Sequence, residues 1–126
     1  MTEQEGKIKV MVLDDEHIAV KTLQRVLGKA GYQVEAFEDP HQALARLEET
    51  CFDIVVTDVV MGDIDGIQVL NKVRQVCPQT RVIIITAFAM MEMARKAMEK
   101  GAFDFVAKPF DAQAIREVVD RAARQD

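Results

Sequence analysis

The sequence is poor in cysteine and has no long apolar run, and these absences exclude several classes of protein. Its two cysteines, Cys51 and Cys77, lack the spacing of a metal-binding motif and fit a reducing compartment, so we expect two core or half-buried thiols. No apolar run approaches the length of a membrane-spanning helix, and the polar N-terminal segment lacks the apolar core of a signal peptide. The sequence therefore predicts a cytoplasmic protein without membrane association.

The chain also lacks low-complexity segments, internal repeats and linkers, which predicts a single domain over residues 1–126. Hydrophobic residues make up 49% and charged residues 29% of the chain, as in ordinary globular proteins. The formal net charge of −5 argues against direct binding of nucleic acid by this domain.

Apolar strand-like segments alternate with amphipathic helical segments along the whole chain. The expected strands are residues 8–13, 34–37, 52–58, 81–86 and 102–107. The expected helices are residues 16–30, 40–49, about 67 to 77, 89–100 and 111–124. Three of the strands are nearly continuous apolar runs, which is typical of a parallel sheet covered on both faces. This alternation predicts a three-layer α/β domain.

Polar side chains follow several of the expected strands. Asp14 and Asp15 follow the first strand, and Asp58, Thr86 and Lys108 lie at the ends of later strands. Because ligands bind outside the carboxyl ends of parallel strands, we expect these side chains to meet at one edge of the sheet. Three carboxylates, a hydroxyl and an ammonium group would then share one site.

This set of side chains suits phosphoryl transfer to a carboxylate. Adjacent carboxylates repel one another and favour a hard divalent cation such as Mg²⁺. A carboxylate can attack phosphorus, and the transfer needs mainly positioning and neutralisation of charge. The sequence has neither a Gly-rich Walker loop nor a Ser/Thr-rich phosphate-binding loop after the first strand. It therefore favours Mg²⁺-assisted chemistry at an aspartate.

Each of these residues also has a simpler interpretation. Asp15 could merely cap the following helix, and from that stretch alone the two interpretations are equally good. Asp58 taken singly would be a solvated loop acid, Thr86 a strand-end hydroxyl and Lys108 a surface charge. Their coincidence at the ends of different strands favours a joint site over four unrelated explanations.

Four short motifs carry a resemblance to a known family. They are LDDE after the first expected strand, TDVVMGDIDG at the third, ITA at the fourth and KPF after the fifth. Together they resemble the receiver domains of two-component response regulators, over essentially the whole chain. The stretch GAFDFVAKPFD particularly resembles receivers of σ54-type transcription activators. The resemblance implies a flavodoxin-like, doubly wound five-stranded parallel sheet of order 2-1-3-4-5 with five helices.

The resemblance also implies roles for individual residues. Asp58 is the implied phospho-acceptor. Mg²⁺ is implied to be held by Asp14, Asp15, Asp58 and the backbone carbonyl of Val60. Lys108 is implied to contact the phosphoryl oxygens, so that Asp58 and Lys108 belong to the catalytic set.

Further implied roles concern the fourth and fifth strands. Thr86 is implied to complete the catalytic set by moving to hydrogen-bond the phosphoryl group, and Phe105 matches the aromatic switch position. The Lys108–Pro109 bond is expected to be cis, as is usual in the family. Gly62 departs from the family pattern, which usually has proline there, so the loop that carries the metal-binding carbonyl gains freedom.

The implied function is a phosphorylation-dependent signalling switch rather than a metabolic enzyme, with weak self-catalysed phosphotransfer and dephosphorylation. A histidine kinase or phosphotransfer protein would donate the phosphoryl group. The surface of the fourth helix, fifth strand and fifth helix (residues 89–124) would repack to control an output domain or partner, or form a homodimer. In the fourth helix we expect Met91, Ala94 and Met98 to face the sheet, leaving Met90 and Met93 for such a partner.

We also expect slow loss of the phosphoryl group. In receivers generally, the residues two positions beyond the acceptor and two beyond the strand-4 hydroxyl flank the path of the attacking water. Here they are Val60 and Phe88, and neither side chain can orient a water molecule.

Two other functions stay open from the sequence. A hydrolase with an aspartyl nucleophile and Mg²⁺ is disfavoured, because dehalogenase-type enzymes need an Asp-x-Asp motif and a cap insertion that this chain lacks. A binding-only receiver is disfavoured by the intact set of site residues. The kinase, the signal, the output and the dimer state are not readable from the sequence.

Overall fold

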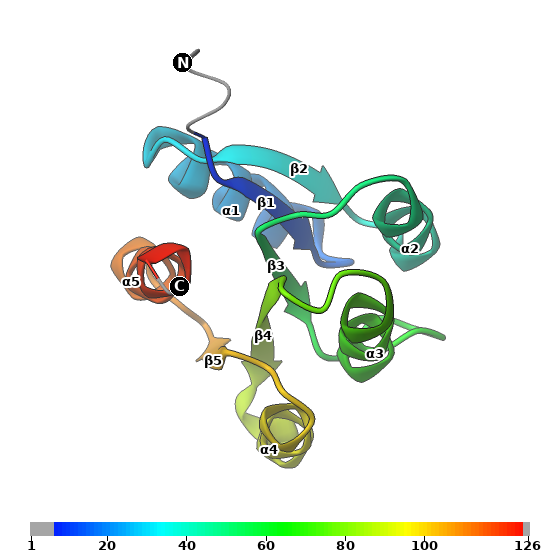
Figure 1. The fold of residues 1–126 in the computed structure, drawn as a ribbon. Helices are drawn as coiled ribbons and strands as arrows, with labels where there is room; N and C mark the ends of the chain where they lie inside the picture. The colour runs from blue at the N-terminus through cyan, green and yellow to red at the C-terminus, as the bar shows by residue number, and fades with distance from the viewer. Residues whose placement is uncertain (1–6, 125–126) are drawn as a thin grey trace.

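Five parallel strands form one sheet in the order β2-β1-β3-β4-β5 in the computed structural model, which describes residues 7–124 apart from the Phe88 side chain (Figure 1). The strands are β1 (Lys9–Leu13), β2 (Gln33–Phe37), β3 (Ile54–Asp58), β4 (Arg81–Ala87) and β5 (Asp104–Lys108). All neighbouring strands pair in parallel, so the predicted flavodoxin-like sheet and its order are confirmed. Strand limits differ from the expected ones by one or two residues, which is usual at element ends.

The helices cover both faces of the sheet (Figure 1). On one face lie α1 (His17–Lys29) and α5 (Ala112–Arg124). On the other lie α2 (Pro40–Glu49), α3 (Gly66–Val76) and α4 (Met91–Glu99), the last preceded by the short 3₁₀ helix η2 (Phe88–Met90). The resulting three layers confirm the predicted α/β architecture.

The central strands supply both halves of the core. Along β1, Val10 and Val12 pack with the helices α1 and α5, whereas Met11 and Leu13 pack on the opposite face. All four side chains are fully buried. Successive residues of a strand point to opposite faces, so a strand covered on both sides must be apolar throughout. This explains the continuous apolar runs in the sequence.

Two helices begin with side-chain caps that fix their first turns. Asp39 caps α2 by accepting a hydrogen bond from the His41 amide at 2.9 Å, and Pro40 occupies the first helical position, as predicted. Asp65 and Gln68 form a reciprocal capping box at the start of α3. The second cap sets where α3 begins after the loop that follows Asp58.

The predicted orientation of helix α4 is right for Ala94 and wrong for Met98. The helix buries Ala94 and Ala97, and Met90 and Met93 pack against the core beneath it. Met98, which we expected to face the sheet, is 37% exposed. The actual buried stripe is rotated toward the small alanine side chains, because these let the helix approach the sheet closely.

The expectation of two free thiols is also wrong, because Cys51 and Cys77 are joined by a disulfide with Cα atoms 5.7 Å apart. Cys51 lies in the loop before β3, and Cys77 is the residue that ends α3. Their positions, 26 residues apart in sequence, come together because the β3–α3 unit returns the chain to the amino end of the sheet.

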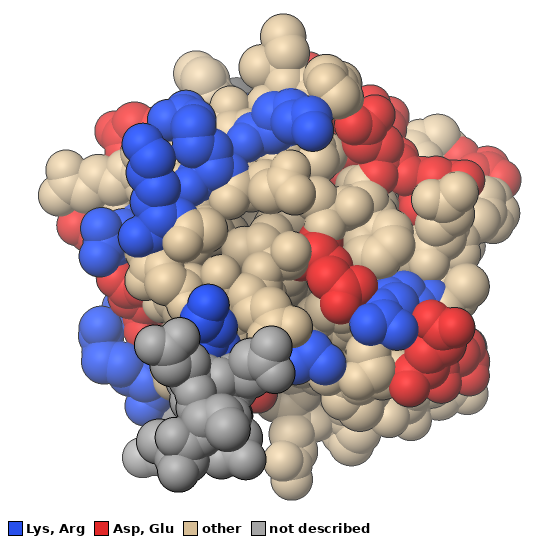
Figure 2. Space-filling view, turned by 90° about the horizontal axis from the view of Figure 1, so that it is seen from above, with Lys and Arg blue, Asp and Glu red and all other residues tan. Residues whose placement is uncertain are grey.

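Charged side chains are unevenly distributed on the surface. On the face shown in Figure 2, a group of Lys and Arg lies at the upper left, and Asp and Glu are more frequent on the right, where one basic group lies among them. Among residues 7–124, no helix is both long and apolar enough to cross a membrane.

Candidate functional site

The polar residues that end the strands meet at the carboxyl edge of the sheet. Asp14 follows β1 directly, and Asp58 is the last residue of β3. The register pairs Asp58 with Ile85, one residue before Thr86, and pairs Ala87 with Lys108 at the end of β5. Parallel pairing therefore brings four residues from four separate parts of the sequence to one edge, as predicted.

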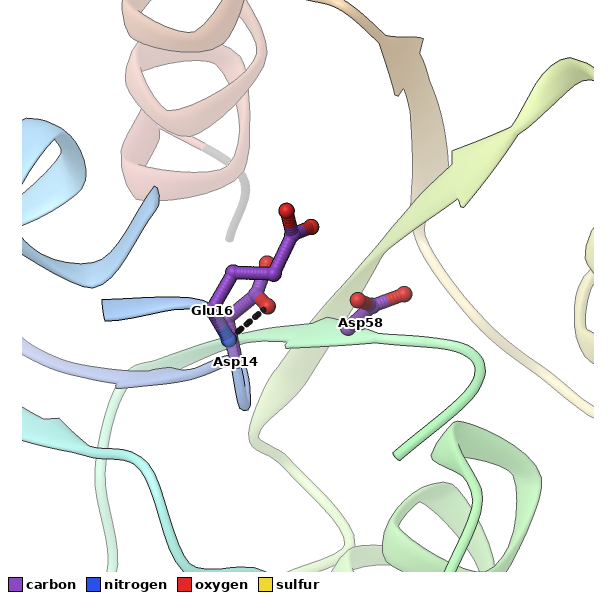
Figure 3. A group of neighbouring side chains, drawn as sticks. All are labelled: Asp14, Glu16 and Asp58. Atoms are coloured by element: carbon purple, nitrogen blue, oxygen red, sulfur yellow. Dashed lines mark hydrogen bonds between the residues drawn. The ribbon is translucent and has the colours of Figure 1, made fainter. Parts of the chain in front are cut away.

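The ammonium group of Lys108 lies at the centre of three carboxylates. Its Nζ is 2.9 Å from Asp14 Oδ2, 2.9 Å from Asp58 Oδ2 and 2.5 Å from Glu16 Oε1. One carboxylate oxygen from each of the three acids lies within 4.8 Å of the other two, and Figure 3 shows the three side chains grouped at the strand ends. The ammonium group of Lys108 therefore reduces the repulsion among the three carboxylates.

Asp14 is the most deeply buried acid of the site. It is fully buried, and its Oδ1 accepts a hydrogen bond from the Glu16 amide at 2.9 Å (dashed in Figure 3). Its Oδ2 is the one buried side-chain oxygen or nitrogen among the described residues without a hydrogen-bond partner, although Lys108 lies close by. Burial, with a contribution from the Asp58 charge, raises the pKa of Asp14 to about 6.

The pKa values of Lys108 and Glu16 shift in the directions expected of an ion pair. Burial alone would lower the pKa of Lys108, but its contacts with Glu16, Asp14 and Asp58 outweigh burial and raise that pKa above its ordinary value. The hydrogen bond from Lys108 lowers the pKa of Glu16. Lys108 is therefore held in its charged form while in contact with these acids.

Asp58 ends β3 and is largely buried, with 7% of its surface exposed. Its Oδ1 accepts a hydrogen bond from the Val60 amide at 3.3 Å, and its Oδ2 accepts one from Lys108 at 2.9 Å. The Val60 side chain is 45% exposed. Gly62 has a φ of +75°, which proline cannot adopt, so the loop here differs in backbone shape from one that carries the usual proline.

Gly66, which sequence reasoning did not single out, allows α3 to pack against the end of β3. A Cβ atom at Gly66 would lie 2.6 Å from the carbonyl oxygen of Asp58 and 2.9 Å from the Cα of Val59. The Gly66 amide also donates a hydrogen bond to the Val59 carbonyl at 2.9 Å. Backbone meets backbone here, so a side chain cannot be accommodated by rotating a neighbouring group.

We expect Gly66→Ala to destabilise the fold by about 1–3 kcal/mol, because the β3–α3 contact must open. The melting temperature should fall by several degrees. The matched control is Gly28→Ala at an exposed position in the last turn of α1, where an added Cβ meets nothing within 4 Å and should not destabilise the helix. Equal melting temperatures for Gly66→Ala and wild type would contradict the close packing.

The side chains of Thr86 and Phe105 contact parts of the domain other than the carboxylates. Thr86 is fully buried, and its hydroxyl donates to the carbonyl oxygens of Ala87 and Met90, each at 3.1 Å. Phe105 is half-buried and packs against the core cluster under α4. The Lys108–Pro109 bond is cis, as expected. Thr86 thus connects the site to the start of α4.

The structure brings together most of the predicted site and adds one residue. Asp14, Asp58 and Lys108 are in contact, whereas Asp15 is exposed and is not part of the carboxylate cluster. Asp15 does not cap α1 either, because the residue at that position is Glu16, whose side chain makes no capping bond. Glu16 was not predicted as a site residue, although its place in LDDE was a signal. The Phe88 side chain lies outside the described part of the structure.

The carboxylates fit a hard divalent cation. They offer only oxygen donors, and the buried Oδ2 of Asp14 is held by the ion pair with Lys108 at 2.9 Å rather than by a hydrogen bond, so a cation could take the place of the ammonium group. Mg²⁺ prefers such oxygens and suits one or two carboxylates with water and phosphate oxygens. Asp14, Asp58 and Glu16 are the side chains in this structure that could hold the ion.

Comparison with known families gives an independent indication of the chain's relationships. The family model described as the response regulator receiver domain matches residues 10–120. The chain is 37% identical over 117 residues to the transcriptional regulatory protein ZraR of Salmonella typhimurium, covering 93% of this chain and 26% of that protein. It is 35% identical over 113 residues to the DNA-binding transcriptional regulator NtrC of the same organism, covering 90% and 24%. The chain thus spans about a quarter of the length of these curated relatives.

Solved structures show the same fold. A response regulator receiver domain protein from Clostridium thermocellum matches with a TM-score of 0.87 and 29% identity, covering 91% of this chain and 93% of that one. Full-length FixJ from B. japonicum matches with a TM-score of 0.88 and 32% identity, covering 94% of this chain and 59% of that one.

Proposed function

Because this chain belongs to the family of response regulator receiver domains, which act in phosphorylation-dependent signalling, we propose that Asp58 is its phospho-acceptor. The donor is a phosphohistidine on a histidine kinase or phosphotransfer protein. The observation that carries the proposal is the contact of Lys108 with Asp58 and Asp14 at the carboxyl edge of the sheet. Intact mass after incubation with acetyl phosphate and Mg²⁺ tests it.

The position of Lys108 suits transfer of a phosphoryl group to Asp58. An oxygen of Asp58 forms the new bond to phosphorus while the bond from phosphorus to the donor nitrogen breaks. Lys108 already contacts the Asp58 carboxylate at 2.9 Å, so its charge can neutralise the phosphoryl oxygens that arrive there. When bound, Mg²⁺ supplies a second positive charge to the same oxygens. Asp14, Asp58 and Glu16, with Asp15 and the Val60 carbonyl as further candidates, would hold it.

The response to phosphorylation is proposed to pass through Thr86. Its hydroxyl now bonds to the carbonyls of Ala87 and Met90 at the start of α4. A phosphoryl group on Asp58 offers new acceptor oxygens. If Thr86 turns toward them, it leaves the Met90 carbonyl and frees space beside Phe105, so the surface of α4, β5 and α5 can repack.

This surface is the proposed contact for an output domain, a partner or a second copy of the chain. The similarity to ZraR and NtrC, which are named as transcriptional regulators, supports an output in transcription and the resemblance to σ54-type activators. Met98 and the half-buried Met91 lie on α4 and are flexible, polarisable side chains suited to such a contact.

We expect Lys108→Met to bind Mg²⁺ about tenfold more tightly than wild type in the absence of phosphoryl donor. The ammonium group competes with a metal ion for Asp14, Asp58 and Glu16, and its removal leaves the carboxylates unopposed. Isothermal titration calorimetry measures the affinity.

The matched control for this measurement is Lys72→Met, because Lys72 pairs with Glu48 far from the strand ends. This control should bind Mg²⁺ as wild type does. Unchanged or weaker Mg²⁺ binding by Lys108→Met would show that the lysine and the metal do not share the carboxylates.

We propose that the phosphoryl group is lost slowly, and we expect Val60→Asn to speed its loss several-fold. The Val60 side chain is exposed beside Asp58 and cannot orient an attacking water, whereas asparagine can. A chase by intact mass after removal of the phosphodonor measures the decay. Val60→Ala is the control for side-chain size alone, and decay of Val60→Asn at the wild-type rate would refute the proposal that Val60 slows loss of the phosphoryl group.

A further inference from the structure

The disulfide between Cys51 and Cys77 lies at the opposite edge of the sheet from Asp58. Cys51 precedes β3, and Cys77 ends α3, so both sit at the amino ends of the strands. The two cysteines differ in accessibility, because Cys51 is exposed and Cys77 is only 4% exposed. One sulfur is therefore open to attack from solvent, and the other is sheltered.

The disulfide also lines a pocket of about 880 Å³ whose other lining residues include Arg74 and Arg81. The pocket is large enough for a tripeptide-sized molecule. The lining also holds one carboxylate, that of Asp53, which accepts a hydrogen bond from the Lys9 amide. Two guanidinium groups against one carboxylate leave a net positive charge, which favours a ligand with carboxylates and favours a thiolate over a thiol. The surroundings of the disulfide thus combine an accessible sulfur, a pocket and a source of positive charge.

We propose that Cys51 and Cys77 form a thiol–disulfide exchange site for small thiols that carry carboxylates. The thiolate of such a molecule attacks the exposed sulfur of Cys51, the Cys51–Cys77 bond breaks, and Cys77 leaves as a thiolate. A second small thiolate then attacks the small-molecule sulfur of the mixed disulfide, which releases Cys51. Overall, two small thiols become one small disulfide, and the protein disulfide becomes two thiols; the reverse reaction closes the bond.

The state of this pair affects the segment that contains the phospho-acceptor. The disulfide closes a loop that holds β3, Asp58 and α3. Closing a loop of this length restricts the unfolded chain and stabilises the folded one. We expect the oxidised domain to melt higher than the reduced domain, with a difference on the order of 10 °C. Exposed disulfides are also the more readily reduced ones, so both states should be reachable.

The first experiment equilibrates the wild-type protein with mixtures of reduced and oxidised glutathione, followed by acid quenching, alkylation and intact mass. The expected result is a bridged fraction that changes along a two-electron curve, with a higher melting temperature at the oxidised end. The proposal is overturned if the pair stays bridged, or stays reduced, over the whole range of mixtures, or if the two states melt at the same temperature.

Single-cysteine variants test which sulfur is attacked. With oxidised glutathione, Cys77→Ser should gain one glutathionyl group on Cys51, whereas Cys51→Ser, which keeps only the buried sulfur, should gain little. Equal labelling of the two variants overturns the assignment to Cys51. Circular dichroism confirms that each variant is folded, and the wild-type titration stays informative if one is not.

The pocket is tested by comparing two reductants. Glutathione should reduce the bridge several-fold faster than 2-mercaptoethanol, after correction for the reactivity of each thiolate toward a model disulfide. Arg74→Gln/Arg81→Gln should abolish that difference. Equal corrected rates in the wild type would overturn the selection of carboxylate-bearing thiols.

Discussion

Asp58→Asn should gain no phosphoryl group from acetyl phosphate and Mg²⁺, whereas the wild type should gain one. The carboxylate of Asp58 ends β3, is 7% exposed where that of Asp14 is fully buried, and contacts Lys108 at 2.9 Å. Asparagine keeps the shape of the side chain but is not a nucleophile toward phosphorus. Intact mass spectrometry in acid-free buffer measures the difference, and the expected effect is complete loss of labelling.

A matched control is Asp63→Asn, which neutralises an exposed acid in the loop just after Asp58. Among residues 7–124, Asp63 pairs only with His41 and lies outside the carboxylate cluster, so this variant should be labelled like the wild type. Chelation of Mg²⁺ should suppress labelling of both. Labelling of Asp58→Asn at the wild-type level, or labelling of the wild type that is undiminished by the chelator, would contradict the assignment of Asp58 as the Mg²⁺-dependent phospho-acceptor.

The same experiment separates a receiver from a hydrolase. A receiver accumulates one phosphoryl group per chain and releases it slowly. A hydrolase with an aspartyl nucleophile would instead release phosphate over many turnovers without accumulating the intermediate. Free phosphate measured alongside the mass therefore decides between the two functions that share this set of carboxylates and Mg²⁺.

The fold was predictable because each strand is marked by its own residues. Runs such as Val10–Leu13 and 82–85 are apolar at every position, since both faces of a parallel sheet are buried. Turn and cap signals then mark the helix starts, as Asp39 and Pro40 do for α2. Local signals and tertiary packing agree in these segments, so the boundaries are wrong by only a residue or two.

The site was predictable only in part, because strand ends indicate which residues meet but not how their side chains turn. Asp14, Asp58 and Lys108 come together as predicted. The direction of the chain as it leaves β1 decides whether Asp15 or Glu16 joins the carboxylate cluster. Asp15 turns to solvent, and the longer side chain of Glu16 reaches back to Lys108. Without the path of the backbone after β1, the sequence alone does not indicate which of two adjacent acids reaches the site.

The two wrong predictions have related physical causes. The partner of a cysteine depends on where distant segments meet, and the spacing of Cys51 and Cys77 holds no such information. In α4, a methionine stripe and an alanine stripe are both apolar and partly overlap. Close approach to the sheet favours the smaller residues, and hydrophobicity alone does not reveal that preference.

The pKa of Asp14 gives the stability of the metal-free domain a definite pH dependence. Burial raises that pKa from 3.8 to about 6, so between these values the folded protein binds more protons at this site than the unfolded chain does. Stability from this group is therefore present at low pH and is lost as the pH rises through about 6. Above that pH the ionised, buried carboxylate lowers the free energy of unfolding by about 3 kcal/mol.

We therefore expect Asp14→Asn, without metal and at pH 8, to melt higher than the wild type by a margin on the order of 10 °C. Asparagine resembles the neutral carboxyl group and can still accept the Glu16 amide bond, while Lys108 keeps Asp58 and Glu16 as partners. The margin should shrink toward zero near pH 4, where the wild-type carboxyl group is protonated. Differential scanning calorimetry across this range measures both.

The matched control is Asp15→Asn, which neutralises the adjacent but exposed acid and should not raise the metal-free melting temperature in this pH-dependent way. Millimolar Mg²⁺ should raise the melting temperature of the wild type by mass action and should do so less for Asp14→Asn, because one ligand is lost. If Asp14→Asn instead melts at or below the wild type at pH 8 without metal, the buried carboxylate stabilises the fold. Its missing hydrogen-bond partner would then no longer indicate a site built to hold a cation.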